Sequence, residues 1–206
     1  MKTNVFFLKK IIREQVDICI KELNSLQESR KSINDLGNDY TVHVKGISST
    51  EDGVIIPEDL VVIKLLKGTS NSEVGLILLE QAQDFDIDGY GVWIVKESYA
   101  QSGWGPFLYD LAMEICGTIM SDREAVSSEA FNVWKTYQDD RPDTTRLQLD
   151  YPEINIPGFE RPLPAEQLAS KSFLSRWPLA GAYHRTDLDT PLLDSLIARK
   201  KINWDS

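Results

Sequence analysis

The sequence has few of the residues on which several classes of protein depend. Its two cysteines, Cys19 and Cys116, are too few for a disulfide framework, and this scarcity is typical of a reduced, cytoplasmic protein. The two histidines, His43 and His184, are too isolated in the sequence to predict a zinc site. The sequence therefore indicates neither a disulfide-stabilised fold nor a resident metal.

Long apolar runs and an excess of positive charge are also missing. The most apolar stretches, LVVIKLL (60–66) and VGLILL (74–79), fall far short of the roughly 20 residues that span a bilayer. No apolar stretch with a cleavage site marks a targeting signal near the start. The 22 basic side chains are outnumbered by 32 acidic ones, which gives a formal net charge of −10. We expect no transmembrane segment and no binding to nucleic acid or to an anionic membrane.

The patterns that are present divide the chain into a helix followed by strands. Apolar residues at steps of three and four predict an amphipathic helix over about 5–29. After a polar loop, short segments rich in β-branched and aromatic residues alternate with turns, which predicts strands joined as antiparallel hairpins. These strands are expected at 40–47, 60–67, 73–81 and 89–98.

The segments after the fourth strand indicate the fold class. The pattern continues with a glycine loop over 99–106, a helix over 107–117, a short strand over 118–122 and a second helix over 127–138, for which Ser127 is a typical N-cap. A strand, a helix and a strand in succession predict one parallel crossover. The expected class is α+β, or mixed α/β, with a mixed, mostly antiparallel central sheet and flanking helices.

The length of 206 residues favours a single domain over 1–206, with its core at about 40–138. The rest, 139–206, is a C-terminal extension. Five of the nine prolines lie within 137–166, where periodicity is weak, so we expect this part to wrap over the surface. Apolar spacing returns over 191–201 and predicts a short helix there.

One stretch carries a resemblance to a known family. The segment VWIVKESYAQSGWGPFLYDLAM (92–113) resembles the fourth strand, pyrophosphate loop and following helix of the GNAT N-acetyltransferase superfamily. Gly103 and Gly105 match the two small positions of the family's loop pattern, and Val95 matches its strand-end valine. Ala100 stands where the family has arginine or glutamine.

Three segments are similar, more narrowly, to GNAT-like proteins of tailed bacteriophages. They are GWGPFLYDLAMEI (103–115), SDREAVSSEAFNVWKTY (121–137) and AYHRTDLDTPLLDSLIARKKI (182–202), so the similarity covers pieces of residues 70–200. This resemblance implies a protein that acts in the cytoplasm of an infected host. The helix predicted over 5–29 has no counterpart in it.

The resemblance implies that acetyl-CoA is the co-substrate and that it binds between splayed fourth and fifth strands. A glycine pair lets backbone N–H groups approach a phosphate, and a helix N-terminus favours negative charge. The pyrophosphate is therefore expected over the amides of Ser102, Gly103, Trp104, Gly105, Phe107 and Leu108. Pantetheine is expected along the backbone of Ile94, Val95 and Lys96. The implied activity is transfer of an acetyl group to an amine of a small molecule or a protein.

The resemblance gives a less direct assignment of catalytic residues. In the family, a tyrosine that protonates the leaving thiolate lies four residues after an alanine near the start of the second helix. With Ala130 as that alanine the position is Trp134, whose indole cannot act as a general acid. Tyr137, one turn later, is either the proton donor or a core or rim aromatic. Glu80 and Glu97 are either bases acting through water or solvated surface acids.

Other interpretations of the chain stay open beside the acyltransferase. The segment DFDIDG (84–89) begins like an EF-hand calcium loop, but Val95 occupies the glutamate position, and we interpret the segment as an acidic hairpin turn. The acidic charge, Ala100 and Trp134 also fit a GNAT-fold protein that has lost catalysis and binds or inhibits a host protein. A virion-associated component that uses the N-terminal helix and the proline-rich extension as contacts is a third possibility.

Overall fold

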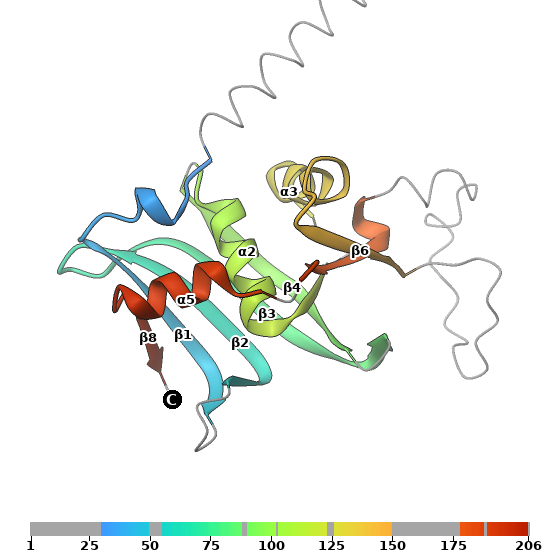
Figure 1. Ribbon diagram of the computed structural model, residues 1–206, viewed down its shortest axis with the longest axis horizontal. Helices are drawn as coiled ribbons and strands as arrows, with labels where there is room; N and C mark the ends of the chain where they lie inside the picture. Colours follow the sequence, from blue (N-terminus) through green and yellow to red (C-terminus); the bar gives the residue numbers. More distant parts are fainter. Residues whose placement is uncertain are drawn as a thin grey trace, which may run out of the picture.

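A mixed, eight-stranded sheet runs through the described part of the protein (Figure 1). The computed structural model describes residues 30–49, 55–87, 90–101, 103–122, 126–149, 178–187 and 189–205. Within them the strand order is β6-β7-β5-β4-β3-β2-β1-β8. The helix predicted over 5–29 and most of the proline-rich stretch lie outside the described residues.

The described elements are eight strands, three α-helices and two short 3-10 helices. The strands are β1 (Tyr40–Ser49), β2 (Ile55–Lys67), β3 (Ser72–Ile87), β4 (Tyr90–Ala100), β5 (Thr118–Ser121), β6 (Thr144–Gln148), β7 (Gly181–Arg185) and β8 (Ile202–Asp205). The helices are η1 (Ile33–Asp35), α2 (Gly105–Cys116), α3 (Ser128–Asp139), η3 (Pro178–Ala180) and α5 (Pro191–Ala198). This combination confirms the predicted α+β class with a mixed central sheet.

Strands β1 to β4 form the antiparallel meander that the sequence predicts. Their buried residues alternate, as at Val61, Ile63 and Leu65 in β2, because successive side chains of a strand point to opposite faces. β3 extends to Ile87, which corrects the interpretation of 84–89 as a hairpin turn, because residues 84–87 belong to the strand and Asp86 and Ile87 pair with Gly91 and Tyr90 of β4. The hairpins are therefore longer than the apolar runs alone indicate.

Strands β4 and β5 are parallel and α2 connects them, which confirms the predicted crossover. α2 begins at Gly105, two residues earlier than expected, because Pro106 fits a first helical turn, where no amide partner is needed. α2 and α5 lie across the same face of the sheet (Figure 1). Their apolar side chains and those of that face form one continuous core.

Helix α3 follows β5 and packs against α2. Ser127 caps it, since the Ser127 hydroxyl accepts a hydrogen bond of 3.2 Å from the Ala130 amide. Trp134 and Tyr137 are its buried residues, as the predicted apolar face requires. The helix therefore presents its aromatic side to α2 and β7.

The C-terminal extension contributes strands to the sheet, which corrects the expectation that its first part wraps over the surface. β6 pairs with β7 and β7 with β5, both antiparallel, so the sheet continues beyond β5. β8 pairs with β1 in parallel at the other edge. Local sequence gives no signal for β6, whose residues are TTRLQ, because backbone pairing with a distant segment holds this short strand. α5 is present where the sequence predicts a short helix, although it ends at Ala198.

None of the helices in the described ranges is both long and apolar enough to cross a membrane. In the same ranges, no group of three or more histidine, cysteine, aspartate and glutamate side chains could hold a metal ion.

Candidate active site

The central feature of the site is the point at which β4 and β5 part. The parallel pairing runs from Val92 to Val95 on β4, and the last cross-strand bond joins the Asp122 amide to the Val95 carbonyl at 3.2 Å. β5 ends at Ser121, whereas β4 continues to Ala100. Beyond Val95, no described strand pairs with this side of β4.

A bulge in β4 lies at the same place. Leu78 of β3 pairs with Glu97 and Leu79 pairs with Val95, so Lys96 is the extra residue. Ile94 and Val95 are held between β3 and β5. The unpaired backbone edge of β4 therefore begins at Lys96. Of the three residues predicted to bind pantetheine through their backbone, only Lys96 lies on this edge, because Ile94 and Val95 are paired on both sides.

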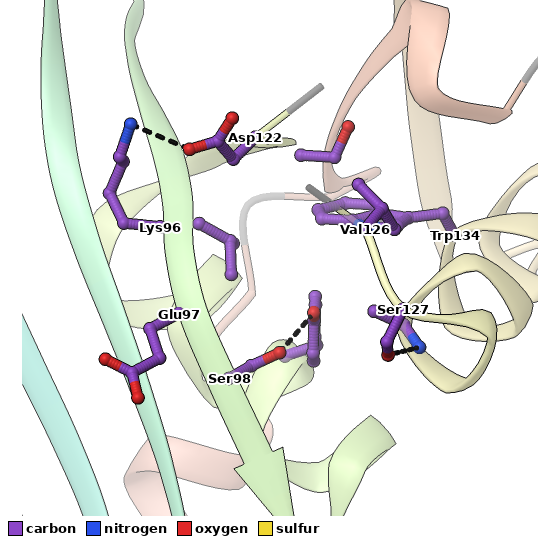
Figure 2. A pocket seen from close by; sticks show the side chains of 11 residues that line it. Lys96, Glu97, Ser98, Asp122, Val126, Ser127 and Trp134 are labelled. Atoms are coloured by element: carbon purple, nitrogen blue, oxygen red, sulfur yellow. Dashed lines mark hydrogen bonds and ion pairs between the residues drawn. The ribbon is translucent and has the colours of Figure 1, made fainter. Parts of the chain in front are cut away.

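A pocket of about 180 Å³ opens between the parted strands (Figure 2). β4 and β5 form one side of it, and α2 and the start of α3 form the other. Its lining residues are Val95, Lys96, Glu97, Ser98, Tyr109, Ser121, Asp122, Val126, Ser127, Ala130 and Trp134.

Polar groups reach the pocket from β4, from α2 and from the end of β5. Ser98 of β4 and Tyr109 of α2 share a hydrogen bond of 2.8 Å between their hydroxyl oxygens. The Ser121 hydroxyl at the end of β5 is buried and takes no hydrogen-bond partner in the described chain. Lys96 Nζ pairs with Asp122 Oδ2 at 2.7 Å, and this ion pair bridges the two strands where they part (Figure 2).

Aromatic packing fixes the wall opposite β4. The Trp134 ring meets the Tyr109 ring edge to face, with centroids 5.1 Å apart and an interplanar angle of 85°. Both residues are almost fully buried, at 1% and 3% exposure. Burial raises the pKa of the Tyr109 phenol, and the hydrogen bond with Ser98 acts in the opposite direction. The phenol is therefore protonated at neutral pH.

The three residues predicted for catalysis are not brought together. The Glu97 side chain lies on the opposite side of β4 from Ser127 and Trp134, with its carboxylate pointing away from them (Figure 2). Glu80 is exposed on β3 opposite Ile94 and does not line the pocket. Tyr137 does not line the pocket either.

The Tyr137 hydroxyl is used in packing between helices. It donates to Asp110 Oδ1 at 2.7 Å, and the Arg141 guanidinium lies over the ring, 5.3 Å from its centroid. Burial, followed by the negative charge of Asp110, raises the pKa of this phenol well above its ordinary value. This geometry corresponds to the alternative in which Tyr137 is a core aromatic.

The glycine loop presents only part of the amide set predicted for pyrophosphate. The Trp104 amide donates to the Gln101 carbonyl and the Leu108 amide donates to the Trp104 carbonyl, both at 3.1 Å. The amides of Gly105 and Phe107 make no hydrogen bond to another described residue. Ser102 lies outside the described residues.

The two glycines of the loop differ in how much free space surrounds them. Gly103 has a φ of 87°, which favours glycine, and its carbonyl accepts a 2.9 Å hydrogen bond from the Lys31 amide. At Gly105 an added Cβ would meet no atom within 4 Å. Gly105 therefore faces free space at the N-terminus of α2 and is not required by packing.

The sequence patterns do not mark Ser98, Tyr109, Ser121 and Asp122 as site residues. Tyr109 belongs to the apolar stripe of α2, where a phenol looks like any other core aromatic. The only local signal is that its hydroxyl needs a partner when the ring is buried. Its proximity to Ser98 depends on how α2 packs on β4.

Among known proteins, no family model matches the chain, and no curated protein is significantly similar to it.

Proposed function

We propose that the protein is an acyl-CoA-dependent N-acyltransferase that transfers an acetyl group from acetyl-CoA to an amine. The observation that carries this proposal is the pocket between β4 and β5, which is lined by Tyr109 of α2, the helix whose first turn has two amides without a hydrogen-bond partner in the described chain. In the GNAT superfamily, which residues 92–113 resemble, the thioester lies between these two strands and the pyrophosphate lies at this helix.

The pocket suits the acyl end of the cofactor. A volume of about 180 Å³ has room for an acetyl thioester but not for the whole of acetyl-CoA. The unpaired edge of β4 from Lys96 onward offers backbone groups to the amides of pantetheine, and the pyrophosphate would lie outside the pocket. There the amides of Gly105 and Phe107 and the positive end of α2 favour its negative charge.

The chemistry required is attack by an amine nitrogen on the thioester carbonyl, followed by loss of the thiolate. The carbonyl oxygen becomes negative during attack, and a preorganised donor near it would lower the barrier. The unpartnered Ser121 hydroxyl is one donor available in the pocket. The attacking amine loses a proton and the thiolate gains one, so the reaction releases an amide and CoA in its thiol form.

Titration with acetyl-CoA tests the proposal. Wild-type protein is expected to bind, and at one hundred times the dissociation constant the ligand should stabilise the fold by about 2.7 kcal/mol. Gly105→Val should abolish binding but leave the fold intact, since a branched side chain enters free space yet blocks the pyrophosphate. Gly105→Ala is the matched control and should weaken binding less. The absence of binding to wild-type protein would refute the proposal.

A second candidate function is a binding or inhibitory module without catalysis. Trp134 favours it, because a side chain with no transferable proton lines the pocket at the position where the resemblance implies a tyrosine. Its partner would be a host or phage protein. Binding of acetyl-CoA without release of CoA thiol, across a panel of polyamines, aminoglycosides and lysine peptides, would favour this candidate.

A further inference from the structure

We propose that Tyr109 is the proton donor to the leaving CoA thiolate, in place of the tyrosine that the resemblance implies at the position of Trp134. This inference rests on the proposed acyltransferase function. It assigns the role to a residue on α2, the helix before β5, where the sequence gives no indication of catalysis.

Tyr109 has the position that the role requires. Tyr109 and Trp134 both line the pocket, and their ring centroids are 5.1 Å apart. Trp134 occupies the place where the resemblance implies a donor. Tyr109 lines the same pocket from α2, so a phenol is present beside the position that lacks one.

The other tyrosines close to the pocket and the lysine that lines it are already engaged, and the Ser121 hydroxyl, which is free of partners in the described chain, is a much weaker acid than a phenol. Tyr109 is the only tyrosine among the residues that line the described pocket. The Tyr137 hydroxyl donates to Asp110, and the Tyr183 hydroxyl donates to the Pro178 carbonyl at 2.8 Å. The Lys96 ammonium forms the ion pair with Asp122 at the point where the strands part.

The phenol of Tyr109 has a partner that can support proton donation. The Ser98 hydroxyl lies 2.8 Å from the Tyr109 oxygen, and either oxygen could donate. Ser98 can therefore donate to Tyr109 when Tyr109 donates to sulfur. This hydrogen bond would stabilise negative charge as it develops on the phenol oxygen.

Protons and electrons balance in this step. The carbon–sulfur bond breaks, its electron pair goes to sulfur, and the phenolic proton of Tyr109 goes to the same sulfur. The proton released by the attacking amine restores the phenol by way of water.

Three charged side chains line the pocket around this phenol, namely Lys96, Glu97 and Asp122. Lys96 and Asp122 are paired with each other, and the Glu97 carboxylate points away from Ser127 and Trp134 (Figure 2).

The experiment measures the thiol pKa of bound CoA by the ultraviolet absorbance of its thiolate, so that no acceptor amine is needed. In wild-type protein, donation by Tyr109 should lower this pKa below that of free CoA measured under the same conditions. In Tyr109→Phe it should rise by about one unit, which means about tenfold less thiolate at a given pH below it. Affinity for acetyl-CoA should stay within about threefold of wild type, since the ground-state thioester is a poor acceptor.

Matched variants separate catalysis from structure. Tyr183→Phe removes a buried, hydrogen-bonded phenol outside the pocket and should leave the thiol pKa unchanged. Ser98→Ala should also raise the thiol pKa, but by less than Tyr109→Phe does. If Tyr109→Phe does not fold, Ser98→Ala replaces it in the test. With any amine that turns over, Tyr109→Phe should lower kcat by about 10²-fold or more.

The outcomes distinguish the role of Tyr109 from the proposed function. An unchanged thiol pKa in folded Tyr109→Phe, or in Ser98→Ala if only that variant folds, overturns the role of Tyr109 and leaves the acyltransferase proposal intact. If wild-type protein binds neither CoA nor acetyl-CoA, the acyltransferase proposal fails, and the role of Tyr109 fails with it. Binding together with a Tyr109-dependent thiol pKa supports both.

Discussion

The Tyr137 hydroxyl donates a 2.7 Å hydrogen bond to Asp110 and thereby joins α3 to α2 outside the pocket. Asp110 keeps Arg141 as a partner at 3.0 Å when this phenol is removed. We therefore expect Tyr137→Phe to cost about 1–2 kcal/mol of unfolding free energy. Turnover should fall less than tenfold, because the phenol does not reach the pocket. Chemical denaturation and steady-state kinetics measure the two effects, and a hundredfold loss of turnover at unchanged cofactor affinity would contradict the prediction.

Trp134→Tyr should place a second phenol at the pocket wall. The indole packs against three tyrosine rings, with centroids 5.1, 5.5 and 6.1 Å away, so a smaller ring leaves a void and should cost about 1–3 kcal/mol. In the Tyr109→Phe background the new phenol should restore part of the lost turnover, since it lies at the position where the resemblance to the GNAT superfamily implies a proton donor. Kinetics of the double variant test this rescue. No recovery in a folded, cofactor-binding double variant would show that position 134 cannot deliver a proton here.

Glu114 should make the protein less stable as the pH rises toward neutral. The carboxylate accepts a 2.7 Å hydrogen bond from the Leu193 amide between α2 and α5, and burial raises its pKa from 4.5 to about 7. A raised carboxyl pKa means that the folded protein binds more protons than the unfolded chain over this range. The contribution is therefore fully present below about 4.5, is lost as the pH rises through 7, and amounts to about 3 kcal/mol at most.

Asp143 acts in the opposite direction at lower pH. Its hydrogen bond with Arg141 lowers its pKa from 3.8 to about 2, so the stability it contributes is present above about 3.8 and lost toward pH 2. The two carboxyls together predict maximal stability between about pH 4 and 5. Thermal unfolding from pH 3 to 8 measures the dependence of stability on pH. In Glu114→Gln the loss of stability above pH 4.5 should become smaller. If that loss is the same as in the wild-type protein, Glu114 is not its cause.

Gly46 should be among the least replaceable glycines of the described chain. Its φ is 79° at the bulge of β1, and a Cβ there would lie 1.8 Å from the Leu60 carbonyl oxygen. Gly46→Ala should therefore cost about 3 kcal/mol or more, because both the backbone and β2 must shift. Gly105→Ala, where a Cβ meets nothing, should stay within about 0.5 kcal/mol of wild type. Urea unfolding of both variants tests this contrast, and equal stability would contradict it.

The elements whose signals are local can be predicted from the order of residues alone. Short segments rich in β-branched and aromatic residues, separated by turns, specify the meander of β1 to β4. A strand, a glycine loop and an apolar helix specify the crossover to β5, because parallel neighbours need a long connection. Ser127 marks the start of α3 because its hydroxyl satisfies an amide of the first turn.

Long-range packing sets the remaining strands and the pocket. β6, β7 and β8 are short and pair with segments far away in the chain, so neither composition nor periodicity marks them. Ser98 and Tyr109 are in contact because β4 continues beyond the end of β5 and α2 packs against this unpaired part of β4. The place of a residue in the apolar pattern of the sequence indicates only whether its side chain is buried. Which neighbour it meets depends on the packing of distant segments, and this is why the sequence indicated Tyr137 and the structure directs attention to Tyr109.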